Sequence, residues 1–258
     1  MKVFITGASS GIGEALAREY RRRHPQAALG LVARRADALH ALAHALDGDR
    51  TLALPADVAD RGAMQRAADA YVQRFGVPDV VIANAGISAG TVTGAPGDAE
   101  VFERIVRTNV IALFDTFAPF VPDMRAAGGG CLVGIASVAG VRGLPGAGAY
   151  SASKAAAISY LESLRVELRG SGVGVVTIAP GYIRTPMTAT NRYRMPFLTD
   201  VDVFARKAVA AIEARRSFAV IPWQMGVVAR GLRLLPNGVF DALFARAPRK
   251  ARDPQGSA

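Results

Sequence analysis

The chain has 258 residues, 51% of them hydrophobic, and its 31 Lys and Arg against 21 Asp and Glu give a formal net charge of +10 at pH 7. This size and apolar content suit one large α/β domain, so we expect residues 1–258 to form a single domain. No apolar run reaches the roughly 18 residues of a membrane-spanning helix. The basic residues are scattered without zinc-ligand spacing or an aromatic RNA-binding signature, which argues against nucleic acid and metal.

Short apolar runs alternate with helical patterns along the chain. We expect strands at 2–6, 27–34, 50–57, 78–86, 130–137 and 174–181, and helices that include 14–23, 36–46, one capped by Asp60, and 152–168. The strands are almost continuously apolar, so both faces of the sheet should be buried. Repeated strand–helix units with right-handed crossovers predict a doubly wound parallel sheet, the Rossmann fold.

A glycine-rich loop, TGASSGIG at 6–13, joins the first strand to the first helix. Gly7 allows a tight turn, Gly11 lets the backbone approach a pyrophosphate, and Gly13 lets the helix pack closely on the sheet. The helix N-terminus then offers free N–H groups and a positive dipole to phosphates. We therefore assign to cofactor binding the loop residues Gly7, Ser9, Ser10, Gly11, Ile12 and Gly13.

The end of the second strand indicates which cofactor binds. A site for NAD usually has Asp or Glu there, whereas this chain has Arg34 and Arg35 after Ala33. A guanidinium pairs well with a 2′-phosphate, so NADP(H) is favoured over NAD(H). After the third strand, Asp57 and Val58 are further candidates: the Asp57 carboxylate either accepts a hydrogen bond from adenine or caps a helix.

From residue 3 to about 186 the chain resembles a short-chain dehydrogenase/reductase of the single-domain kind. The loop at 6–13 matches the family's TGxxxGxG, 84–86 its NAG, and YSASK at 150–154 its YxxxK. The family's catalytic serine lies thirteen positions before the tyrosine, at Ser137 here, and RTNV and PGYIRT match two further motifs. One departure is Ala83, where the family often has a second asparagine before NAG.

The resemblance implies an oxidoreductase with Asn109, Ser137, Tyr150 and Lys154 as catalytic residues. It also implies cofactor contacts from Asn84, Ala85, Gly86, Tyr150, Lys154, Pro180, Gly181, Ile183 and Thr185. By the same resemblance, Lys154 binds the nicotinamide ribose, and Asn109 holds a water that links Lys154 to solvent.

The chemistry of the tyrosine and the lysine can be argued from the residues themselves. Reduction of a carbonyl needs a hydride on carbon and a proton on oxygen, and Tyr150 is a possible acid. A free phenol titrates near 10, and a cation one helical turn away, Lys154, is expected to lower that pKa. The Ser137 hydroxyl can hydrogen-bond the substrate oxygen. Small neighbours, Ser151 to Ser153, are expected to pack against the cofactor or a neighbouring helix.

The segment beyond the sixth strand has the position of a variable substrate lid, at about 187–203. Four of its side chains are candidates for an apolar pocket: Met187, Tyr193, Met195 and Phe197. Arg192 and Arg194 either meet an anionic group or are simply solvated. This composition favours a mid-sized hydrophobic carbonyl or alcohol.

A last strand is expected to start at Phe218, followed by an amphipathic C-terminal extension at about 223–258 that is broken at Pro236. The extension forms a subunit interface of a homodimer or homotetramer, attaches peripherally to an anionic membrane, or packs over the chain's own active site. The single cysteine, Cys131, cannot form an internal disulfide, and MKVFITG lacks a signal peptide's apolar core, so we expect a cytoplasmic protein.

The leading hypothesis is an NADP(H)-dependent oxidoreductase that interconverts a carbonyl and a secondary alcohol. One alternative within the family is a 3-oxoacyl-thioester reductase. An alternative from another class is a non-catalytic NADP(H)-binding sensor, which would have no need of the proton donor that Tyr150 supplies.

Overall fold

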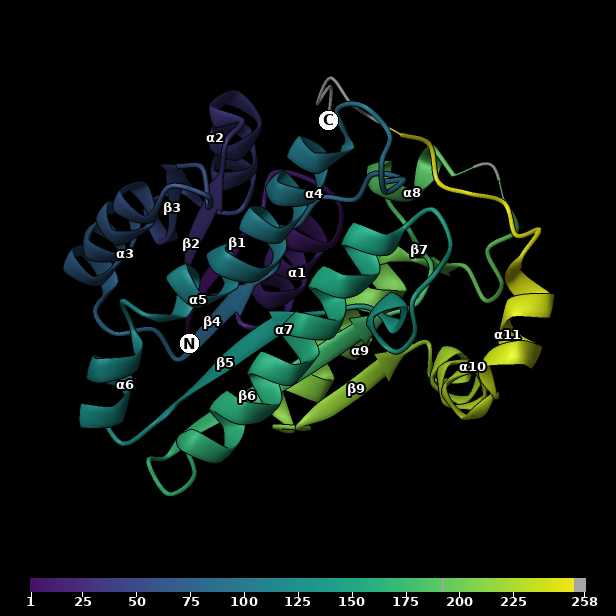
Figure 1. Cartoon of the computed structure of the whole chain (residues 1–258). Helices are drawn as coiled ribbons and strands as arrows, with labels where there is room; N and C mark the ends of the chain where they lie inside the picture. Colours follow the sequence, from purple (N-terminus) through teal and green to yellow (C-terminus); the bar gives the residue numbers. More distant parts are fainter. Residues whose placement is uncertain (192, 253–258) are drawn as a thin grey trace.

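Seven parallel strands form the central sheet, in the order β3-β2-β1-β4-β5-β6-β9 (Figure 1). Their bounds are β1 Lys2–Thr6, β2 Ala28–Ala33, β3 Thr51–Pro55, β4 Val80–Ala83, β5 Gly130–Ile135, β6 Val173–Pro180 and β9 Phe218–Ile221. The computed structural model describes residues 1–191 and 193–252. The chain runs outward from β1 to β3 and then in the opposite direction from β4, so the strand order reverses between β1 and β4, where α/β sheets bind ligands.

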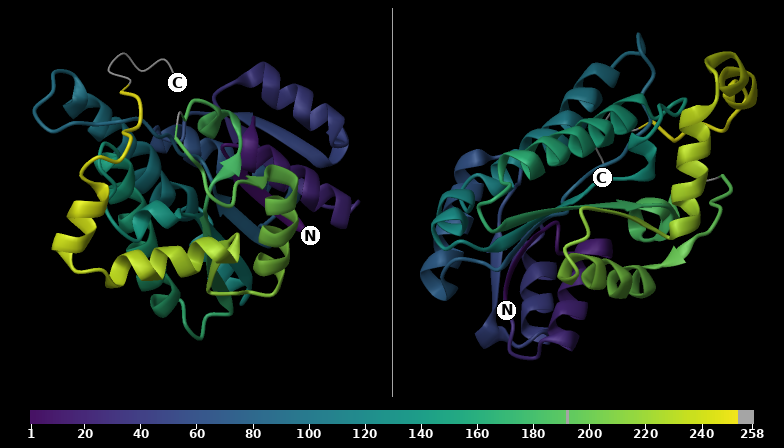
Figure 2. Two further views of the ribbon diagram at one scale, coloured as in Figure 1. Left: turned by 90° about the vertical axis from the view of Figure 1, so that its right-hand side faces the viewer. Right: turned by 90° about the horizontal axis from the view of Figure 1, so that it is seen from below.

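Helices cover both faces of this sheet. The longer helices are α1 Gly11–Arg23, α2 Ala36–Ala45, α3 Arg61–Phe75, α4 Asp98–Val106, α7 Gly148–Glu167, α9 Val201–Glu213, α10 Trp223–Leu234 and α11 Asn237–Phe244. Short helices are α5 Ala112–Phe117, α6 Val121–Ala126 and α8 Pro186–Ala189, and Ile183–Arg184 (β7) pairs with Thr199–Asp200 (β8). Figure 2 shows the helices on either side of the sheet, α4 and α7 in teal on one side and α1 and α9 on the other.

The two faces are buried because successive residues of each strand point to opposite sides. Val3 and Ile5 face α1, α2 and α9, where Leu16 and Phe204 pack against them in one core. Phe4 lies in the other core, with Tyr71 of α3 and side chains of α5, α6 and α7. The predicted doubly wound sheet is confirmed.

The predicted strands lie within one residue of the observed ones or contain them, and Phe218 begins the seventh strand as expected. Asp60 caps α3, since its carboxylate accepts a hydrogen bond from Ala63 N at 2.9 Å. Two helices begin earlier than the sequence predicts: α1 at Gly11 instead of 14 and α7 at Gly148 instead of 152. Both first turns contain glycine, which carries little helix propensity.

The sequence pattern predicts no element between 87 and 129, where the structure has α4, α5 and α6. A π-helical turn, Arg107–Ile111, joins α4 to α5. Such a turn inserts an extra residue into the helical period, so the apolar positions do not follow one 3.6-residue repeat.

Candidate active site

A cleft of about 500 Å³ lies at the carboxyl ends of β1 to β6. It is lined by Ser137 and by all the predicted cofactor residues except one: Gly7, Ser9, Ser10, Gly11, Ile12, Arg34, Arg35, Asp57, Val58, Asn84, Ala85, Gly86, Tyr150, Lys154, Pro180, Gly181, Ile183 and Thr185. The exception, Gly13, lies behind the loop. Parallel strands end at one edge of the sheet, which is why residues so far apart in sequence meet here.

The glycine-rich loop can take its course only with glycine at particular positions. Gly7 has φ 67° and Gly11 has φ 60°, a conformation that L side chains rarely adopt. A Cβ on Gly13 would lie 2.2 Å from the Gly7 carbonyl oxygen, so α1 approaches the end of β1 too closely for any side chain. The expected close packing of helix on sheet is therefore present.

Asn84 supports this loop from the neighbouring strand. Its Nδ2 donates to the Thr6 carbonyl at 2.9 Å and to the Gly7 carbonyl at 3.2 Å. Asn84 thereby joins the ends of β1 and β4 and fixes the tight turn at the N-terminus of α1. Ser10, the N-cap of α1, makes no side-chain capping bond.

The cleft is strongly basic. It is lined by Arg34, Arg35, Arg104, Arg107 and Lys154 and by a single carboxylate, that of Asp57, among the residues described. Such a site favours an anionic ligand.

The two arginines after β2 have different surroundings. Arg35 donates to Ser9, to Oγ at 3.1 Å and to the carbonyl at 3.2 Å, and so ties the start of α2 to the glycine-rich loop. Arg34 is exposed at the same end of the cleft. Asp57 does not cap α3, because Asp60 does; its Oδ1 accepts from Ala59 N at 2.9 Å. Helix capping, one of the two roles expected of Asp57, is therefore wrong.

Ser137, Tyr150 and Lys154 converge in the cleft from β5 and α7. Ser137 follows β5, and its hydroxyl accepts from Ala139 N at 3.2 Å and lies near enough to the phenol of Tyr150 to affect its pKa. The Lys154 Nζ lies 5.8 Å from the centroid of the Tyr150 ring and donates to the Ile135 carbonyl at 2.8 Å. A Cβ on Gly140 would lie 2.6 Å from the backbone of Lys154, so the Ser137 loop packs directly on α7.

Burial shifts the pKa of both titratable groups. It lowers the pKa of Lys154 to about 8. It raises the pKa of Tyr150 above its usual value, and the nearby Ser137 hydroxyl partly offsets this rise in pKa. The sequence predicts that Lys154 lowers the phenol pKa, but in this structure desolvation outweighs any such effect.

Asn109 lies behind this group, in the π-helical turn. Its Nδ2 donates to the Ile87 carbonyl and to Ser153 Oγ, each at 3.0 Å, and its Oδ1 accepts from Ile87 N at 2.9 Å. The side chain thus joins the loop after β4 to α7. A second cavity, of about 10 Å³, is bordered by Asn109 and Lys154. That is close to the smallest volume that accommodates one water molecule.

Ser151 and Ser153 are buried as expected, at 4% and 1% exposure. Ala152, between them, is exposed, so the expected packing is wrong at that position. It lies on the outward face of α7, because the residues on either side of it point inward.

The segment expected to form a substrate lid lies mainly between β7 and β8. Met187 lines the cleft, whereas Tyr193, Met195 and Phe197 are outside its lining, and Phe197 is half exposed. The Tyr193 ring packs edge-on against Tyr182, and burial raises the pKa of Tyr193 to about 12, with Tyr150 near enough to contribute. Arg194 is exposed, and Arg192 lies outside the described residues. Residues 201–203, the last of the expected lid, belong to α9, which begins at Val201.

The C-terminal extension has two parts. Helices α10 and α11 meet at Pro236, as predicted, and Arg142 from the loop after Ser137 donates to the Leu232 carbonyl at 2.6 Å and to the Leu235 carbonyl at 2.7 Å. Beyond α11 the chain runs back toward the start of α4 (Figure 1), where Gly90 N donates to the Ala251 carbonyl. This part of the extension therefore packs over the chain's own active-site edge.

Several residues at the site have no counterpart among the predictions. Ile87, Arg104, Arg107 and Thr108 line the cleft. The spacing of Arg104 and Arg107, three residues apart just before Asn109, places them on one helical face and was a usable signal. Lys250, near Tyr150, carries no local signal, because it comes from a segment 100 residues away in sequence.

No group of three or more metal-ligating side chains is found within 1–191 and 193–252. Over the same ranges, none of the helices has the length and apolar character needed to cross a bilayer.

The fold and the cleft define a nucleotide-binding oxidoreductase, and comparison with known proteins agrees. The family model for short chain dehydrogenases matches residues 1–195. The chain belongs to the short-chain dehydrogenase/reductase family, whose members act on alcohol and carbonyl groups with NAD(H) or NADP(H).

Among individual relatives, an uncharacterized oxidoreductase of Myxococcus xanthus is 38% identical over 94% of this chain and 95% of its own length. The 2-(R)-hydroxypropyl-CoM dehydrogenase of Xanthobacter autotrophicus is 32% identical over 93% of this chain and 98% of its own. A 3-ketoacyl-(acyl-carrier-protein) reductase from Brucella melitensis, solved with NADH, superimposes with a TM-score of 0.77 at 26% identity, covering 85% of this chain and 94% of that one.

Proposed function

We propose that the chain is an NADP(H)-dependent oxidoreductase that interconverts a carbonyl and a secondary alcohol, with Tyr150 as general acid and base. The observation that carries the proposal is the convergence of Ser137, Tyr150 and Lys154 on one basic cleft of about 500 Å³. The glycine-rich loop fits a dinucleotide, because no Cβ could occupy Gly13 and the N-terminus of α1 has no side-chain cap.

The bound cofactor supplies or accepts the hydride. For reduction, Ser137 holds the carbonyl oxygen by a hydrogen bond, and the Tyr150 phenol donates its proton to that oxygen as negative charge develops. Lys154 stabilises the resulting phenolate from one helical turn away. In the reverse direction Tyr150 takes the proton from the alcohol.

Proton resupply to Tyr150 is supported by Lys154 and Asn109. A lysine with a pKa of about 8 exchanges its proton near neutral pH, unlike an ordinary lysine. The cavity between Lys154 and Asn109 has room for about one water molecule. We assign to Asn109 the positioning of that water and of the loop after β4.

A preference for NADP(H) is supported by the arginines after β2. Arg34 is exposed and able to reach a 2′-phosphate, while Arg35 is held against the phosphate-binding loop by Ser9. At the end of β2 the chain has Ala33 where a carboxylate would favour the 2′-hydroxyl of NAD.

The substrate is proposed to be a mid-sized hydrophobic carbonyl or alcohol, with Met187 at the cleft. The alternative reaction is reduction of a 3-oxoacyl thioester. The observation that supports this alternative is the structural likeness to a 3-ketoacyl-(acyl-carrier-protein) reductase. A non-catalytic sensor is disfavoured, because Ser137, Tyr150 and Lys154 are all present and adjacent.

We further propose that residues 1–258 act as one catalytic unit, that the lid governs substrate choice, and that the chain assembles as a homo-oligomer.

A cytoplasmic location is also proposed. Cys131 is buried and its thiol pKa is raised to about 11 by burial, which suits the unreactive thiol of a cytoplasmic protein.

The test is cofactor oxidation by purified protein with ketones, aldehydes and 3-oxoacyl thioesters, each with NADPH and with NADH. We expect turnover that Tyr150→Phe abolishes while its Kd for NADPH stays within about threefold, because the phenol acts mainly on the substrate. Substantial activity in Tyr150→Phe would overturn the role of the phenol.

In the same assay, Arg34→Ala should raise the KM for NADPH at least about tenfold and leave the KM for NADH nearly unchanged. Equal effects on both cofactors would contradict the contact with the 2′-phosphate.

A further inference from the structure

Residues 250–252 are anchored beside Tyr150 by three contacts. Gly90 N donates to the Ala251 carbonyl at 2.7 Å, and a Cβ on Gly90 would lie 2.2 Å from the Lys250 carbonyl oxygen. On the far side, Arg252 binds both oxygens of Asp98 at 3.0 Å, and Asp98 is only 4% exposed. Backbone and ion-pair contacts on both sides of Lys250 therefore fix where its side chain starts.

The Lys250 ammonium lies beside the Tyr150 ring, although Lys250 and Ser88 are not among the residues that line the cleft. Its Nζ donates to Ser88 Oγ at 2.8 Å and lies 5.9 Å from the centroid of the Tyr150 ring. Lys154 approaches the same ring to 5.8 Å, so the tyrosine has two lysines near it. Lys250 is half-buried, and desolvation lowers its pKa.

This ammonium has no anionic partner within the described part of the chain. Its one hydrogen bond goes to a neutral hydroxyl, and no carboxylate of residues 1–191 or 193–252 forms an ion pair with it. A partly desolvated charge that the described residues leave without a counter-charge is unfavourable, and a ligand that supplies the negative charge removes that cost. The nearby Asp98 carboxylate is already taken by Arg252 and Val92 N.

We propose that Lys250 and Ser88 bind a carboxylate of the substrate, so that the enzyme acts on oxo acids and the corresponding hydroxy acids. This assignment rests on the proposed function, since it takes the carbonyl to lie at Tyr150. Because Lys250 is close to that ring, the carboxylate is separated from the reacting carbonyl by a few bonds. A carrier-linked thioester has no charge so near its carbonyl, and an oxo acid fits better.

The side chain is tested with Lys250→Met, which keeps the apolar stem and removes the charge. The matched control is Lys207→Met, which removes one positive charge from the exposed face of α9. The probes are phenylglyoxylate, its methyl ester and a set of 3-oxo and 4-oxo acids with their methyl esters. Two quantities are measured: kcat/KM with NADPH, and Kd of each probe for the Tyr150→Phe protein saturated with NADPH, by calorimetry.

We expect at least one acid of the set to bind and to react at least about tenfold better than its ester, as loss of one charge-assisted contact would predict. Lys250→Met should remove the preference for the acid, while kcat/KM for the ester and the Kd for NADPH stay within about threefold of their natural values. Lys207→Met should leave the preference intact. Acids that bind no better than esters, or a preference that survives Lys250→Met, would overturn the carboxylate site.

The two readouts separate this inference from the proposed function. Turnover of neutral ketones without any preference for acids contradicts the carboxylate site alone. Acid binding that depends on Lys250, without turnover of any compound by the chain with Tyr150 intact, supports the site and contradicts the oxidoreductase assignment.

A backbone variant tests the placement of the tail independently of the lysine charge. In Gly90→Ala the new methyl would collide with the Lys250 carbonyl, so the tail must move and the preference for acids should fall as in Lys250→Met. Gly129→Ala is the control, because a Cβ there meets nothing within 4 Å. A Gly90→Ala protein with an unchanged preference would overturn the assignment of Lys250.

Discussion

At the scale of single residues, Lys154 carries a conflict between stability and function. It is 5% exposed, and its ammonium has the Ile135 carbonyl as its hydrogen-bond partner. Burial lowers its pKa from 10.5 to about 8, so the folded protein binds this proton less strongly than the unfolded chain does. The charged lysine therefore destabilises the fold at neutral pH.

Lys154→Met should consequently raise the stability while it removes catalysis. The pKa shift corresponds to roughly 3 kcal/mol, and the unpaired Ile135 carbonyl offsets about 1–2 kcal/mol of it. The cost in the natural protein is fully present below pH 8 and fades as the pH rises toward 10.5, so the gain in Tm should be largest at pH 7 and shrink at pH 10. Thermal unfolding across that range checks this, with Lys207→Met as an exposed control. A lower Tm at pH 7 would contradict it.

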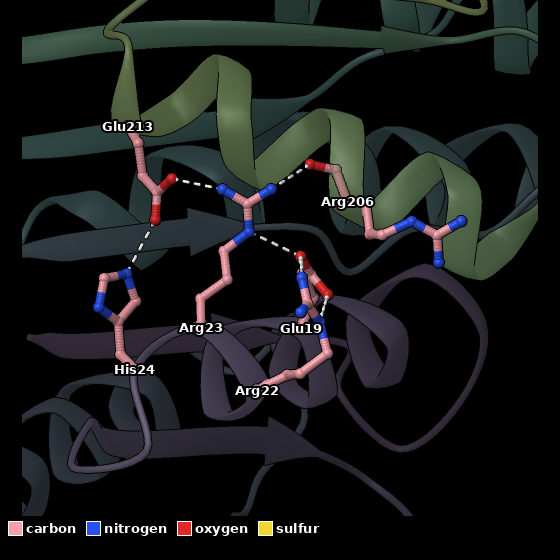
Figure 3. Close-up of polar contacts among 6 residues, drawn as sticks. All are labelled: Glu19, Arg22, Arg23, His24, Arg206 and Glu213. Carbon is pink, nitrogen blue, oxygen red and sulfur yellow. Dashed lines mark hydrogen bonds and ion pairs between the residues drawn. The ribbon is translucent and has the colours of Figure 1, made fainter.

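At the scale of elements, α1 and α9 are joined by a polar cluster, shown in Figure 3. Arg23 Nη1 contacts Glu213 at 2.7 Å and Nη2 donates to the Arg206 carbonyl at 3.0 Å, while His24 contacts the other Glu213 oxygen. Glu19, 6% exposed, holds Arg22 and Arg23 in place. The cluster thus connects α1, which follows the glycine-rich loop, to α9, which follows β8.

Glu19→Gln should weaken this connection by about 1–3 kcal/mol at pH 7. The hydrogen bond from Arg22, with Arg23, lowers the Glu19 pKa to about 2 against the opposing effect of burial. This stabilisation is present above pH 4.5 and lost as the pH falls toward 2, so the Tm difference between the natural protein and Glu19→Gln should shrink over that range. Glu14→Gln, on the same helix and in an exposed pair with Arg18, should change little. A difference that is constant with pH would contradict the role of the charge.

The elements also show what the sequence could predict. The strands and the cleft were predictable, because continuous apolar runs mark buried parallel strands and these end at one edge. The Tyr150–Lys154 spacing likewise locates both side chains on one helical face. The π-helical turn at Arg107–Ile111 interrupts the periodicity on which helix prediction depends. Lys250 reaches Tyr150 through long-range contacts of the tail with Gly90 and Asp98, for which no local pattern exists.

At the scale of the whole molecule, the described residues include two exposed apolar faces, on a chain with a net charge of +10. One is on α10 and α11, where Trp223 is 69% and Leu234 84% exposed; the other is on α5 and α7, where Phe114 is 51% and Val166 60% exposed. Exposed apolar patches of this kind are typical of subunit interfaces, and two separate faces suffice to build a symmetric tetramer from dimers. Peripheral attachment to an anionic membrane is the competing use of the first face.

We predict a homotetramer in which each of the two faces forms a separate subunit interface, about a different symmetry axis. Trp223→Glu with Leu234→Glu should leave dimers, because a charge on the first face blocks one interface only, and Phe114→Glu should leave dimers of the other kind. All three changes together should give monomers, as measured by light scattering after gel filtration. The natural protein supplies the reference, and thermal unfolding of each variant shows whether its fold persists. A monomeric natural protein that cosediments with anionic vesicles at low salt would contradict the tetramer and assign α10 and α11 to a membrane surface, since scattered positive charge and an apolar helix face are what such a surface attracts.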